Sequence, residues 1–244
     1  MMKKVFVYIG SRAGQKSMTF EFVNEILKRT TKSIGEKNIK VDLYTADSCK
    51  INNCLSCNNC FFNGECFQDK NDDMTTIKSK MLDSDFIILA SPVYLHNVSG
   101  DMKVFIDRIS YWSHLLRLSG KAGIVIATST GNGLDLTTKY LHKVMTYMGI
   151  KVVGEFGVVP YDMNKETINS IEKCTNIIKE YLNGKKIESD HFLELIFKAN
   201  KIAIESQKNF ASSEYEYWNK SGLIECNNFE EVLRIIEKDE ISIR

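Results

Sequence analysis

Five short apolar segments, each followed along the chain by a segment with helical spacing, limit the folds open to these 244 residues. The apolar segments are rich in β-branched residues and most end at small, hydroxylated or turn-forming residues, as buried strands do. We predict strands at residues 5–9, 41–45, 86–90, 124–127 and 152–159. Uniformly apolar strands that alternate with helices are typical of a parallel sheet covered on both faces. The sequence therefore predicts an α/β fold with a doubly wound, five-stranded parallel sheet.

The strand pattern stops after the fifth strand and its helix. We expect a helix at residues 191–206, an aromatic patch at residues 215–218, and a last helix that Asn228 caps. The chain is therefore divided into a sheet domain at residues 1–183 and a helical C-terminal extension at residues 184–244. We expect the extension to be too small to bury a core of its own and to pack on the sheet domain or on a second subunit.

Charge and apolar patterning exclude several classes of protein. The 32 basic and 31 acidic residues give a formal net charge of +1, which argues against a dedicated nucleic-acid-binding protein. The apolar run at residues 5–9 is too short for a signal peptide, and no run approaches the ~20 residues that span a bilayer. We expect a cytoplasmic protein without membrane or nucleic-acid partners. Its seven cysteines should then be reduced, and those that cluster in one short stretch are expected to be metal ligands or redox groups rather than disulfides.

Ligands of open parallel sheets bind at the carboxyl ends of the strands, so the loops after predicted strands one, three and four are candidate sites. The first loop carries Ser11, Ser17 and Thr19, whose hydroxyl groups could hold a phosphate together with backbone N–H groups at the next helix start. Residues 10–17 also match the phosphate-binding pattern of nucleoside triphosphatases, except at Gln15, where that pattern requires a glycine. A triphosphatase and an unoccupied structural turn are therefore the alternatives at this loop.

The second loop, residues 91–100, follows the third strand without the acidic magnesium ligand that a triphosphatase would need. Pro92 is expected to force an extended turn where the strand ends, and Ser99 to cap the next helix. Tyr94 and His96 would then lie on an exposed loop, where a planar ligand could contact them. Taken alone, His96 is better explained as a surface or capping residue than as a catalytic base.

The third loop, residues 128–133, contains two glycines that would let the backbone approach a ligand closely. The segment from Gly131 lacks the third glycine of the dinucleotide-binding fingerprint. It therefore does not predict a dinucleotide site.

Several stretches of the chain form a recognisable set: Gly10-Ser11 with Ser17 and Thr19, Ser91-Pro92-Val93-Tyr94, residues 98–103, residues 105–108, and Thr128-Ser129-Thr130-Gly131. This set resembles the flavodoxin-like NADPH-dependent FMN reductases over about residues 4–160. The stretch from Pro92 to Arg108 is the most specific part. The cysteine-rich loop at residues 49–72 with Asp72-Asp73-Met74, and the patch at residues 215–218, are similar to the branch known as iron–sulfur flavoproteins.

The resemblance implies that FMN lies across the three loops of a flavodoxin-like domain. Small hydroxyls and N–H groups suit the phosphate, a flat loop suits the ring, and close backbone donors suit the pyrimidine edge, which gains negative charge on reduction. One departure from the family lies in the first loop. Pro-Arg often follows Gly-Ser in the family, whereas Arg12-Ala13-Gly14 follows it in this chain. The implied contacts are Ser11, Arg12, Ser17, Met18 and Thr19 for the phosphate, Pro92, Val93, Tyr94, Leu95, His96 and Asn97 for the ring, and Ser129, Thr130, Gly131, Asn132 and Gly133 for the pyrimidine edge.

Four cysteines have the compact spacing of an iron–sulfur site: Cys54, Cys57, Cys60 and Cys66. Such spacing lets one loop cover a face of a [4Fe–4S] cluster, whereas structural zinc usually joins two cysteine pairs that are a dozen or more residues apart. Gly64 would help the chain return to the fourth cysteine. A [4Fe–4S] cluster, free thiols and zinc all remain open here. Two of the three cysteines outside this spacing, Cys49 and Cys174, are expected to be plain buried thiols.

The sequence thus predicts an FMN-dependent oxidoreductase that moves electrons from NAD(P)H through FMN to a small-molecule acceptor or to a protein such as ferredoxin, with a possible [4Fe–4S] relay. No side chain is required as a catalytic acid or base because the flavin carries the chemistry, and Tyr94 and His96 are expected to line the substrate face. The alternative is a non-enzymatic electron carrier that exchanges with ferredoxin, although such carriers are usually acidic and this chain is neutral. The resemblance also implies a homodimer or a higher homo-oligomer.

Overall fold

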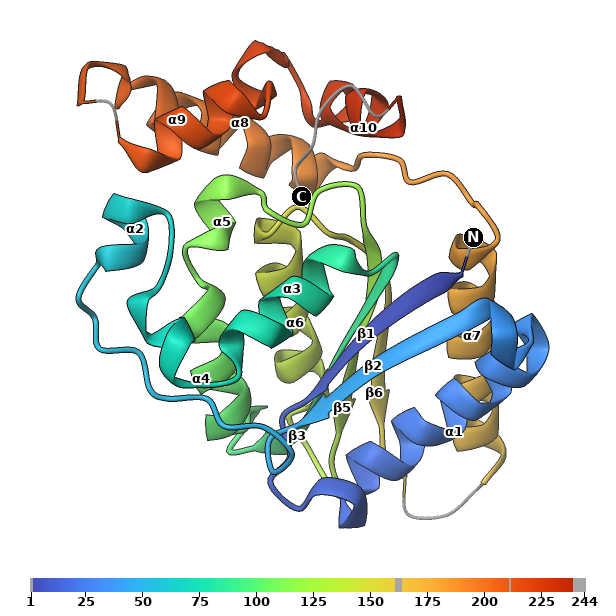
Figure 1. The fold of residues 1–244 in the computed structure, drawn as a ribbon. Helices are drawn as coiled ribbons and strands as arrows, with labels where there is room; N and C mark the ends of the chain where they lie inside the picture. The colour runs from blue at the N-terminus through green and yellow to red at the C-terminus, as the bar shows by residue number, and fades with distance from the viewer. Residues whose placement is uncertain (1, 161–163, 211, 239–244) are drawn as a thin grey trace.

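Five parallel strands form a sheet in the order β2-β1-β3-β5-β6 (Figure 1). Numbered along the chain, this is the 2-1-3-4-5 order of flavodoxin-like folds, with the switch point between β1 and β3. The predicted doubly wound fold is therefore confirmed. The strands are β1 (Lys3–Ile9), β2 (Ile39–Thr45), β3 (Phe86–Tyr94), β4 (Asn97–Val98), β5 (Ala122–Thr128) and β6 (Lys151–Val158).

A computed structural model describes residues 2–160, 164–210 and 212–238. The rest of the two predicted domains, Met1 and residues 161–163, 211 and 239–244, lies outside the described residues. Among the residues described, no helix is both long and apolar enough to cross a membrane.

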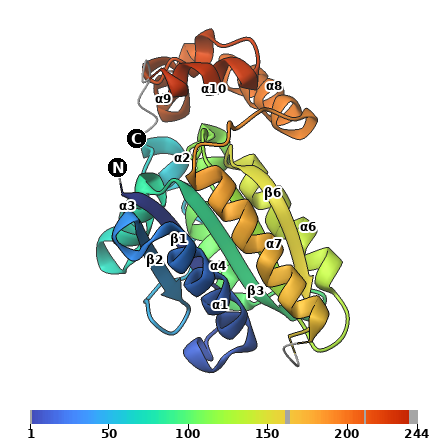
Figure 2. The same cartoon turned by 90° about the vertical axis from the view of Figure 1, so that its right-hand side faces the viewer.

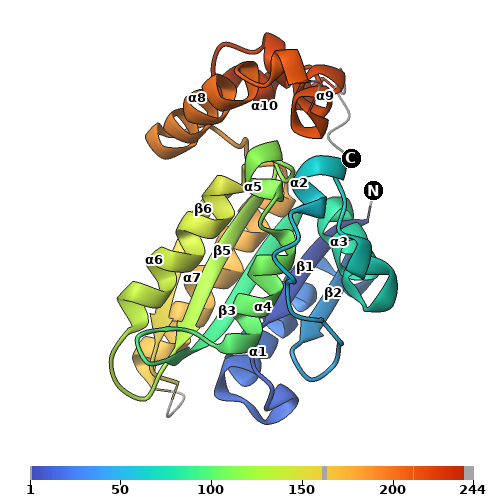
Figure 3. The same ribbon diagram turned by 90° about the vertical axis from the view of Figure 1, so that its left-hand side faces the viewer.

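Helices cover both faces of the sheet because the strand side chains alternate between them. On β1, Val5 and Val7 belong to the core beneath α1 and α7 (Figure 2), whereas Phe6 and Tyr8 belong to the core beneath α3, α4 and α6 (Figure 3). All four side chains are buried, which explains why this strand is uniformly apolar. The helices are α1 (Met18–Ile34), α3 (Met74–Asp83), α4 (Gly100–Ile109), α5 (Trp112–Leu115), α6 (Leu134–Tyr147) and α7 (Lys165–Leu182).

The third strand is longer than predicted. It was expected to end before Pro92, but β3 continues to Tyr94 and turns back into the two-residue strand β4, which pairs with it antiparallel. Pro92 stays inside the strand and lies opposite Thr128 of β5. The expected extended turn at this position is therefore wrong, and a β-hairpin takes its place.

The C-terminal extension consists of α8 (His191–Glu205), α9 (Ser213–Lys220) and α10 (Phe229–Glu237). It lies at the end of the sheet opposite the carboxyl ends of the strands (Figure 1). As predicted, Asn228 caps α10 by accepting a hydrogen bond from Glu231 N at 2.9 Å. Contrary to prediction, the extension buries a small core of its own, in which Phe197 stacks on Trp218 with ring centres 5.5 Å apart. One buried side chain of the sheet domain, Leu116, completes that core, so the expected packing on the sheet domain is confirmed.

Candidate functional site

The loops after β1, β3 and β5 meet at the carboxyl edge of the sheet, at the lower end of the molecule in Figure 1. The buried hydroxyl groups of Thr19 and Thr128 share a hydrogen bond of 2.6 Å, which links the first loop to the end of β5. Ser99 Oγ donates to the backbone oxygen of Gly10, which links the second loop to the first. The three predicted loops therefore form one continuous surface.

The first loop leaves several hydrogen-bond donors free at the start of α1. Ser17 caps this 17-residue helix by accepting from Phe20 N at 3.1 Å. Among the described residues, the backbone N–H groups of Met18 and Thr19 have no acceptor, and the hydroxyl of the nearly buried Ser11 has no partner. Free N–H groups at the positive end of a long helix, with a hydroxyl in the same loop, are the donors that a phosphate such as that of FMN requires. The residues present therefore fit the phosphate.

Two predicted phosphate contacts are already used within the protein. Arg12 is largely exposed and forms an ion pair with Asp101 of α4, and the hydrogen bond to this carboxylate raises the pKa of Arg12. The hydroxyl of Thr19 is held by Thr128, so Thr19 can offer a phosphate its backbone N–H rather than its side chain. Arg12 would have to exchange partners to contact a phosphate directly.

The second loop is a tight hairpin rather than an open loop. Leu95 and His96 form its two-residue turn, and both have a left-handed backbone, with φ values of 47° and 62°. Neither residue is the glycine or asparagine that such turns favour, so each position is strained. Tyr94 and Leu95 are 60% and 95% exposed, which confirms that this segment lies at the surface. Ser99 caps α4 as predicted, by accepting from Met102 N at 3.1 Å.

The third loop packs against that hairpin. Gly133 has a φ of 84°, and a Cβ atom there would lie 2.8 Å from His96 Cα and 2.9 Å from Val93 Cγ1. The close backbone approach expected at Gly133 is thus made to the hairpin. Gly131 faces open space, and its N–H donates to Ser129 Oγ at 3.0 Å. The remaining predicted edge contacts, Thr130 and Asn132, are exposed beside it.

The four spaced cysteines lie away from these loops, on a segment that passes from the end of β2 along the side of the sheet domain to α2 (Asn59–Asn63) (Figure 3). Cys54 and Cys57 are exposed in the extended part, and Cys60 lies in α2, which ends at the left-handed Gly64 before Cys66. All four thiols are free, and their soft sulfur donors fit an iron–sulfur cluster. In the part of the chain that is described, no three His, Cys, Asp or Glu side chains lie close enough together to hold a metal ion. Binding a cluster would therefore require the segment between the four thiols to rearrange.

The two ends of this cysteine-rich loop are bound to each other. Lys50 N donates to Asp73 Oδ2 at 2.7 Å, and Asp73 N donates to the backbone oxygen of Lys50 at 3.0 Å. Asn52 N donates to Asp72 Oδ2 at 2.9 Å, and Gln68 Nε2 donates to the backbone oxygen of Asn53 at 2.9 Å. These contacts join residues 50–53 to residues 68–73 and form what we call the loop base.

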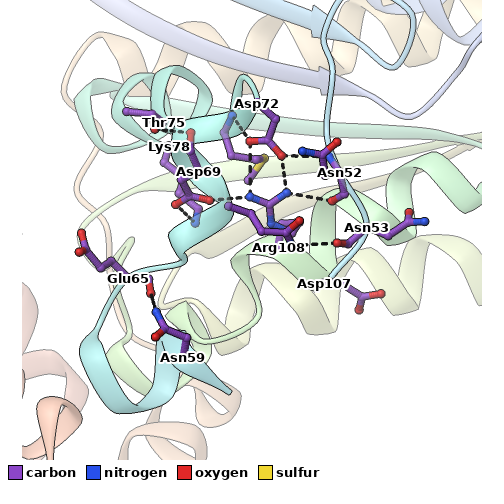
Figure 4. Close-up of polar contacts among 12 residues, drawn as sticks. Asn52, Asn53, Asn59, Glu65, Asp69, Asp72, Thr75, Lys78, Asp107 and Arg108 are labelled. Carbon is purple, nitrogen blue, oxygen red and sulfur yellow. Dashed lines mark hydrogen bonds and ion pairs between the residues drawn. The ribbon is translucent and has the colours of Figure 1, made fainter. Parts of the chain in front are cut away.

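A buried charge network, which was not predicted from the sequence, supports the loop base (Figure 4). The fully buried guanidinium of Arg108 donates to Asp69 Oδ1 at 2.7 Å and to Asp72, and Lys78 Nζ donates to Asp69 Oδ2 at 2.6 Å. Burial opposes ionisation of Asp72, but hydrogen bonds from Arg108 and from backbone N–H groups outweigh it and lower the pKa of the carboxyl group. The available signal was an arginine at a position of α4 that turns inward together with Phe105 and Ile109.

The other three cysteines lie in different environments from the four spaced cysteines. Cys49 donates to the backbone oxygen of Thr45 at 3.3 Å, and burial, followed by nearby Asp73 and Asp47, raises its pKa to about 11. Its thiol is therefore protonated at neutral pH, although it is partly rather than fully buried. Cys174 is buried as predicted, and Cys226 is buried in the core of the extension.

The extension holds the far end of the cysteine-rich loop. Ser213 Oγ donates to the backbone oxygen of Phe61 at 2.8 Å, and the Phe61 ring lies 5.1 Å from that of His114. His114 in turn bonds through Nδ1 to Glu214 of α9 at 2.8 Å, and its backbone oxygen accepts from Trp218 Nε1 at 2.8 Å. The aromatic patch predicted at residues 215–218 is thus part of the contact between α9 and the sheet domain.

Comparison with known proteins identifies relatives in sequence and in structure. The chain is 34% identical over 207 residues to an iron-sulfur flavoprotein of Archaeoglobus fulgidus, covering 82% of this chain and 93% of that protein. It is 28% identical over 155 residues to an iron-sulfur flavoprotein of Methanosarcina thermophila, covering 59% and 78% of the two chains. The apo crystal structure of an NADH:FMN oxidoreductase matches 73% of this chain and 89% of its own, with a TM-score of 0.56 at 17% identity, which shows the shared fold.

Residues 3–163 also match the sequence profile of the family described as NADPH-dependent FMN reductase. They include β1 to β6, the three loops at the carboxyl edge and the cysteine-rich loop. The predicted oxidoreductase class, with FMN and NAD(P)H as its cofactors, is supported at the level of this family. The chain therefore belongs to the NADPH-dependent FMN reductase family.

Proposed function

We propose that the protein binds FMN across the three loops at the carboxyl edge and transfers electrons from NAD(P)H to a small-molecule or protein acceptor. The observation that carries this proposal is the set of free donors in the first loop and at the start of α1, namely the N–H groups of Met18 and Thr19 and the unpaired hydroxyl of Ser11. When bound, FMN supplies the hydride- and electron-transfer chemistry.

The protein residues hold and orient the cofactor. The start of α1 would neutralise the phosphate, and the hairpin from Pro92 to Asn97 would support one side of the ring system. Backbone N–H groups of the exposed residues Thr130 and Asn132 would donate to the pyrimidine edge, where the negative charge of the reduced form is stabilised. Tyr94 and His96 are exposed beside that ring position, so they are our candidates for contact with the substrate.

The phosphate site can be tested at Met18 by a substitution that removes one backbone N–H donor. Met18 is the first residue of α1, and Ser17 before it has φ −85° and ψ 141°, a conformation that a following proline accepts. Met18→Pro therefore removes the N–H donor while the helix keeps its start. We expect FMN affinity to fall by about 10- to 100-fold, the loss of one hydrogen bond to a charged group. Met18→Ala, which keeps the N–H, is the matched control and should bind FMN nearly as the original protein does.

Binding and turnover are then measured on the same preparation. Fluorescence titration gives the FMN affinity, and steady-state assays compare NADH with NADPH against quinones, free flavin, nitro compounds, oxygen and ferredoxin. Equal FMN affinity in the two Met18 variants would reject the phosphate site. Fast exchange with ferredoxin, together with negligible turnover with every pyridine nucleotide, would favour the electron-carrier alternative over the enzyme.

We further propose that Cys54, Cys57, Cys60 and Cys66 bind a [4Fe–4S] cluster that relays electrons to and from the flavin. Their spacing, their free thiols and the bound ends of the loop support this proposal, as do the names of the iron-sulfur flavoproteins to which the chain is similar. Anaerobic purification should give a protein with about four iron and four sulfide per chain. Cys57→Ser should lose most of the iron, whereas Cys174→Ser, which changes a distant buried thiol, should keep it. Zinc in place of iron, or no metal after anaerobic reconstitution, would reject the cluster.

The expected homo-oligomer and cytoplasmic location belong to the same proposal. Apolar side chains on α8 support self-association, since Phe192, Leu195 and Ile202 are exposed by 62%, 49% and 71%. Light scattering during gel filtration tests this point, and a monomer at micromolar concentration would contradict it.

A further inference from the structure

Arg108 contacts both sides of the segment that carries the four spaced cysteines. Its Nη1 donates to the backbone oxygen of Asn52 at 2.8 Å, two residues before Cys54. Its Nη2 donates at 2.7 Å to Asp69, three residues after Cys66. Figure 4 shows the guanidinium between these two segments of the loop base. One side chain therefore bridges the point where the cysteine segment leaves the sheet domain and the point where it returns.

The network needs an arginine in particular. The planar guanidinium reaches the backbone oxygen of Asn52 and the carboxylates of Asp69 and Asp72 at once, a geometry that the single ammonium of lysine cannot reproduce. Lys78 supplies the second positive charge by pairing with Asp69. Two cations thus face two carboxylates, and the buried network is electrically balanced.

The helix that carries Arg108 also borders the three loops at the carboxyl edge, which we call the flavin loops because we propose that they bind FMN. Ser99 caps the start of α4 and bonds to the backbone oxygen of Gly10 and, through its N–H at 3.0 Å, to Ser91 Oγ. Arg108 lies nine residues further along the chain, a rise of about 13 Å in an α-helix. A single rigid helix therefore fixes the position of the loop base relative to the proposed FMN site.

We propose that Arg108 is a positioning residue that closes the cysteine-rich loop and holds its two ends in place for binding of the iron–sulfur cluster. This inference rests on the proposed role of Cys54, Cys57, Cys60 and Cys66. The side chain acts through the loop base, because its contacts are Asn52, Asp69 and Asp72 and none of them is a cysteine. Rearrangement of the segment on cluster binding would then occur between fixed ends.

Arg108→Lys tests the inference because it keeps the buried positive charge but removes the planar guanidinium that bonds to Asn52, Asp69 and Asp72 at once. In the metal-free protein, we expect faster amide hydrogen exchange at residues 53–67 and no change at residues 10–19. After anaerobic reconstitution, we expect iron to be held about 10- to 100-fold more weakly against a chelator, as for other changes that disturb the support of metal ligands. The control is Arg29→Lys, which alters a partly exposed ion pair with Glu25 on the other side of the sheet. It should match the original protein in both measurements.

The two measurements separate this inference from the proposed function. If the original protein takes up no iron and sulfide, the cluster proposal fails, and the exchange measurement alone decides whether Arg108 positions the loop. Unchanged exchange in Arg108→Lys, or unchanged iron retention where the original protein binds iron, overturns the inference. If Arg108→Lys does not fold, Asp69→Asn replaces it, since this variant keeps the contacts of Arg108 with Asp72 and Asn52. The same two effects are then expected at smaller size, and their absence overturns the inference.

Discussion

The flavin loops and the cysteine-rich loop belong to one sheet domain, but different forces hold them. The flavin loops leave adjacent parallel strands, so the sheet itself brings them together, and short contacts such as that between Thr19 and Thr128 fix their details. The cysteine-rich loop leaves the edge strand β2 and is held by a buried charge network at its base and by α9 near α2. Donors for a phosphate are therefore in place at the first site, whereas the thiols at the second are tethered but not gathered.

The largest effect is expected when the charge network at the loop base is broken. Arg108→Met would leave Asp69 and Asp72 buried without their main cation, which costs about 3–5 kcal/mol in the free energy of unfolding. The matched change Arg29→Met removes a partly exposed ion pair and should cost no more than about 1 kcal/mol. Urea denaturation of the metal-free proteins measures both values. Similar losses in the two variants would show that the loop base is not specially dependent on charge.

A smaller effect is expected at the contact between two flavin loops. Gly133→Ala introduces a Cβ at a φ of 84° and against His96 Cα, so we expect a loss of about 1–3 kcal/mol and weaker FMN binding. Gly131→Ala, two residues earlier, adds its Cβ to open space and should change stability by no more than about 0.5 kcal/mol. Thermal unfolding and FMN titration of the pair measure this contrast. If both variants behaved alike, packing on the hairpin would not explain Gly133.

Two buried threonines are expected to change the free energy of unfolding in opposite directions when each is replaced by valine. Thr19→Val leaves the buried hydroxyl of Thr128 without its partner and should cost about 1–2 kcal/mol. Thr137→Val removes a buried hydroxyl that has no hydrogen-bond partner among the described residues, so it should be neutral or stabilising. The free energies of unfolding of the two variants measure this difference, and a stabilised Thr19→Val would contradict it.

The smallest effect is expected in the pH dependence of the contact between α9 and the sheet domain. The hydrogen bond to Glu214 raises the pKa of His114. The contribution of this bond to stability is therefore complete below the ordinary histidine pKa of about 6.5, and it is lost as pH rises through the raised pKa of the folded state. Burial opposes ionisation of Glu214, but the bonds from His114 and Gln207 outweigh it and lower its pKa. Its own contribution is lost only as pH falls below the ordinary range of a glutamate. Half of the His114 side chain is exposed, which screens the effect.

Hydrogen exchange of α9 at pH 6 and pH 9 checks this dependence. We expect slower exchange at pH 6, after correction for the intrinsic effect of pH on exchange rates. His114→Gln should remove most of the difference between the two conditions. A difference that persists in this variant would have to come from other groups.

Much of the sheet could be predicted from the sequence because buried parallel strands are uniformly apolar. The strand cores, the caps at Ser99 and Asn228, and the positions of the three loops at the carboxyl edge follow from local patterns. The hairpin at the end of β3 could not be predicted in the same way, since its turn residues, Leu95 and His96, lack the asparagine and glycine that mark such turns. Gly133 packs closely against His96 and Val93 of this hairpin, and no local pattern encodes such a tertiary contact.

At the cysteine-rich loop, candidate ligands could be named from the sequence, but the network that supports the loop could not. The spacing of the cysteines is local, whereas Arg108 and Asp72 are 36 residues apart and meet only in the folded chain. Arginine is usually exposed, so the helical spacing that places Arg108 on the inner side of α4 with Phe105 and Ile109 is a weak signal when it is read from the sequence alone. The core of the extension was also underestimated, because it is completed by Leu116 from the sheet domain.

The bound ends of the cysteine-rich loop affect how tightly its thiols can hold a metal. Bringing together ligands on a free chain carries an entropic cost of loop closure that the binding energy must offset. Here the hydrogen bonds of Lys50, Asn52 and Gln68 have closed the loop before any metal arrives. The four thiols are therefore tethered at a high effective concentration relative to one another, and a metal that bound them would meet a smaller entropic cost of loop closure than on a free chain.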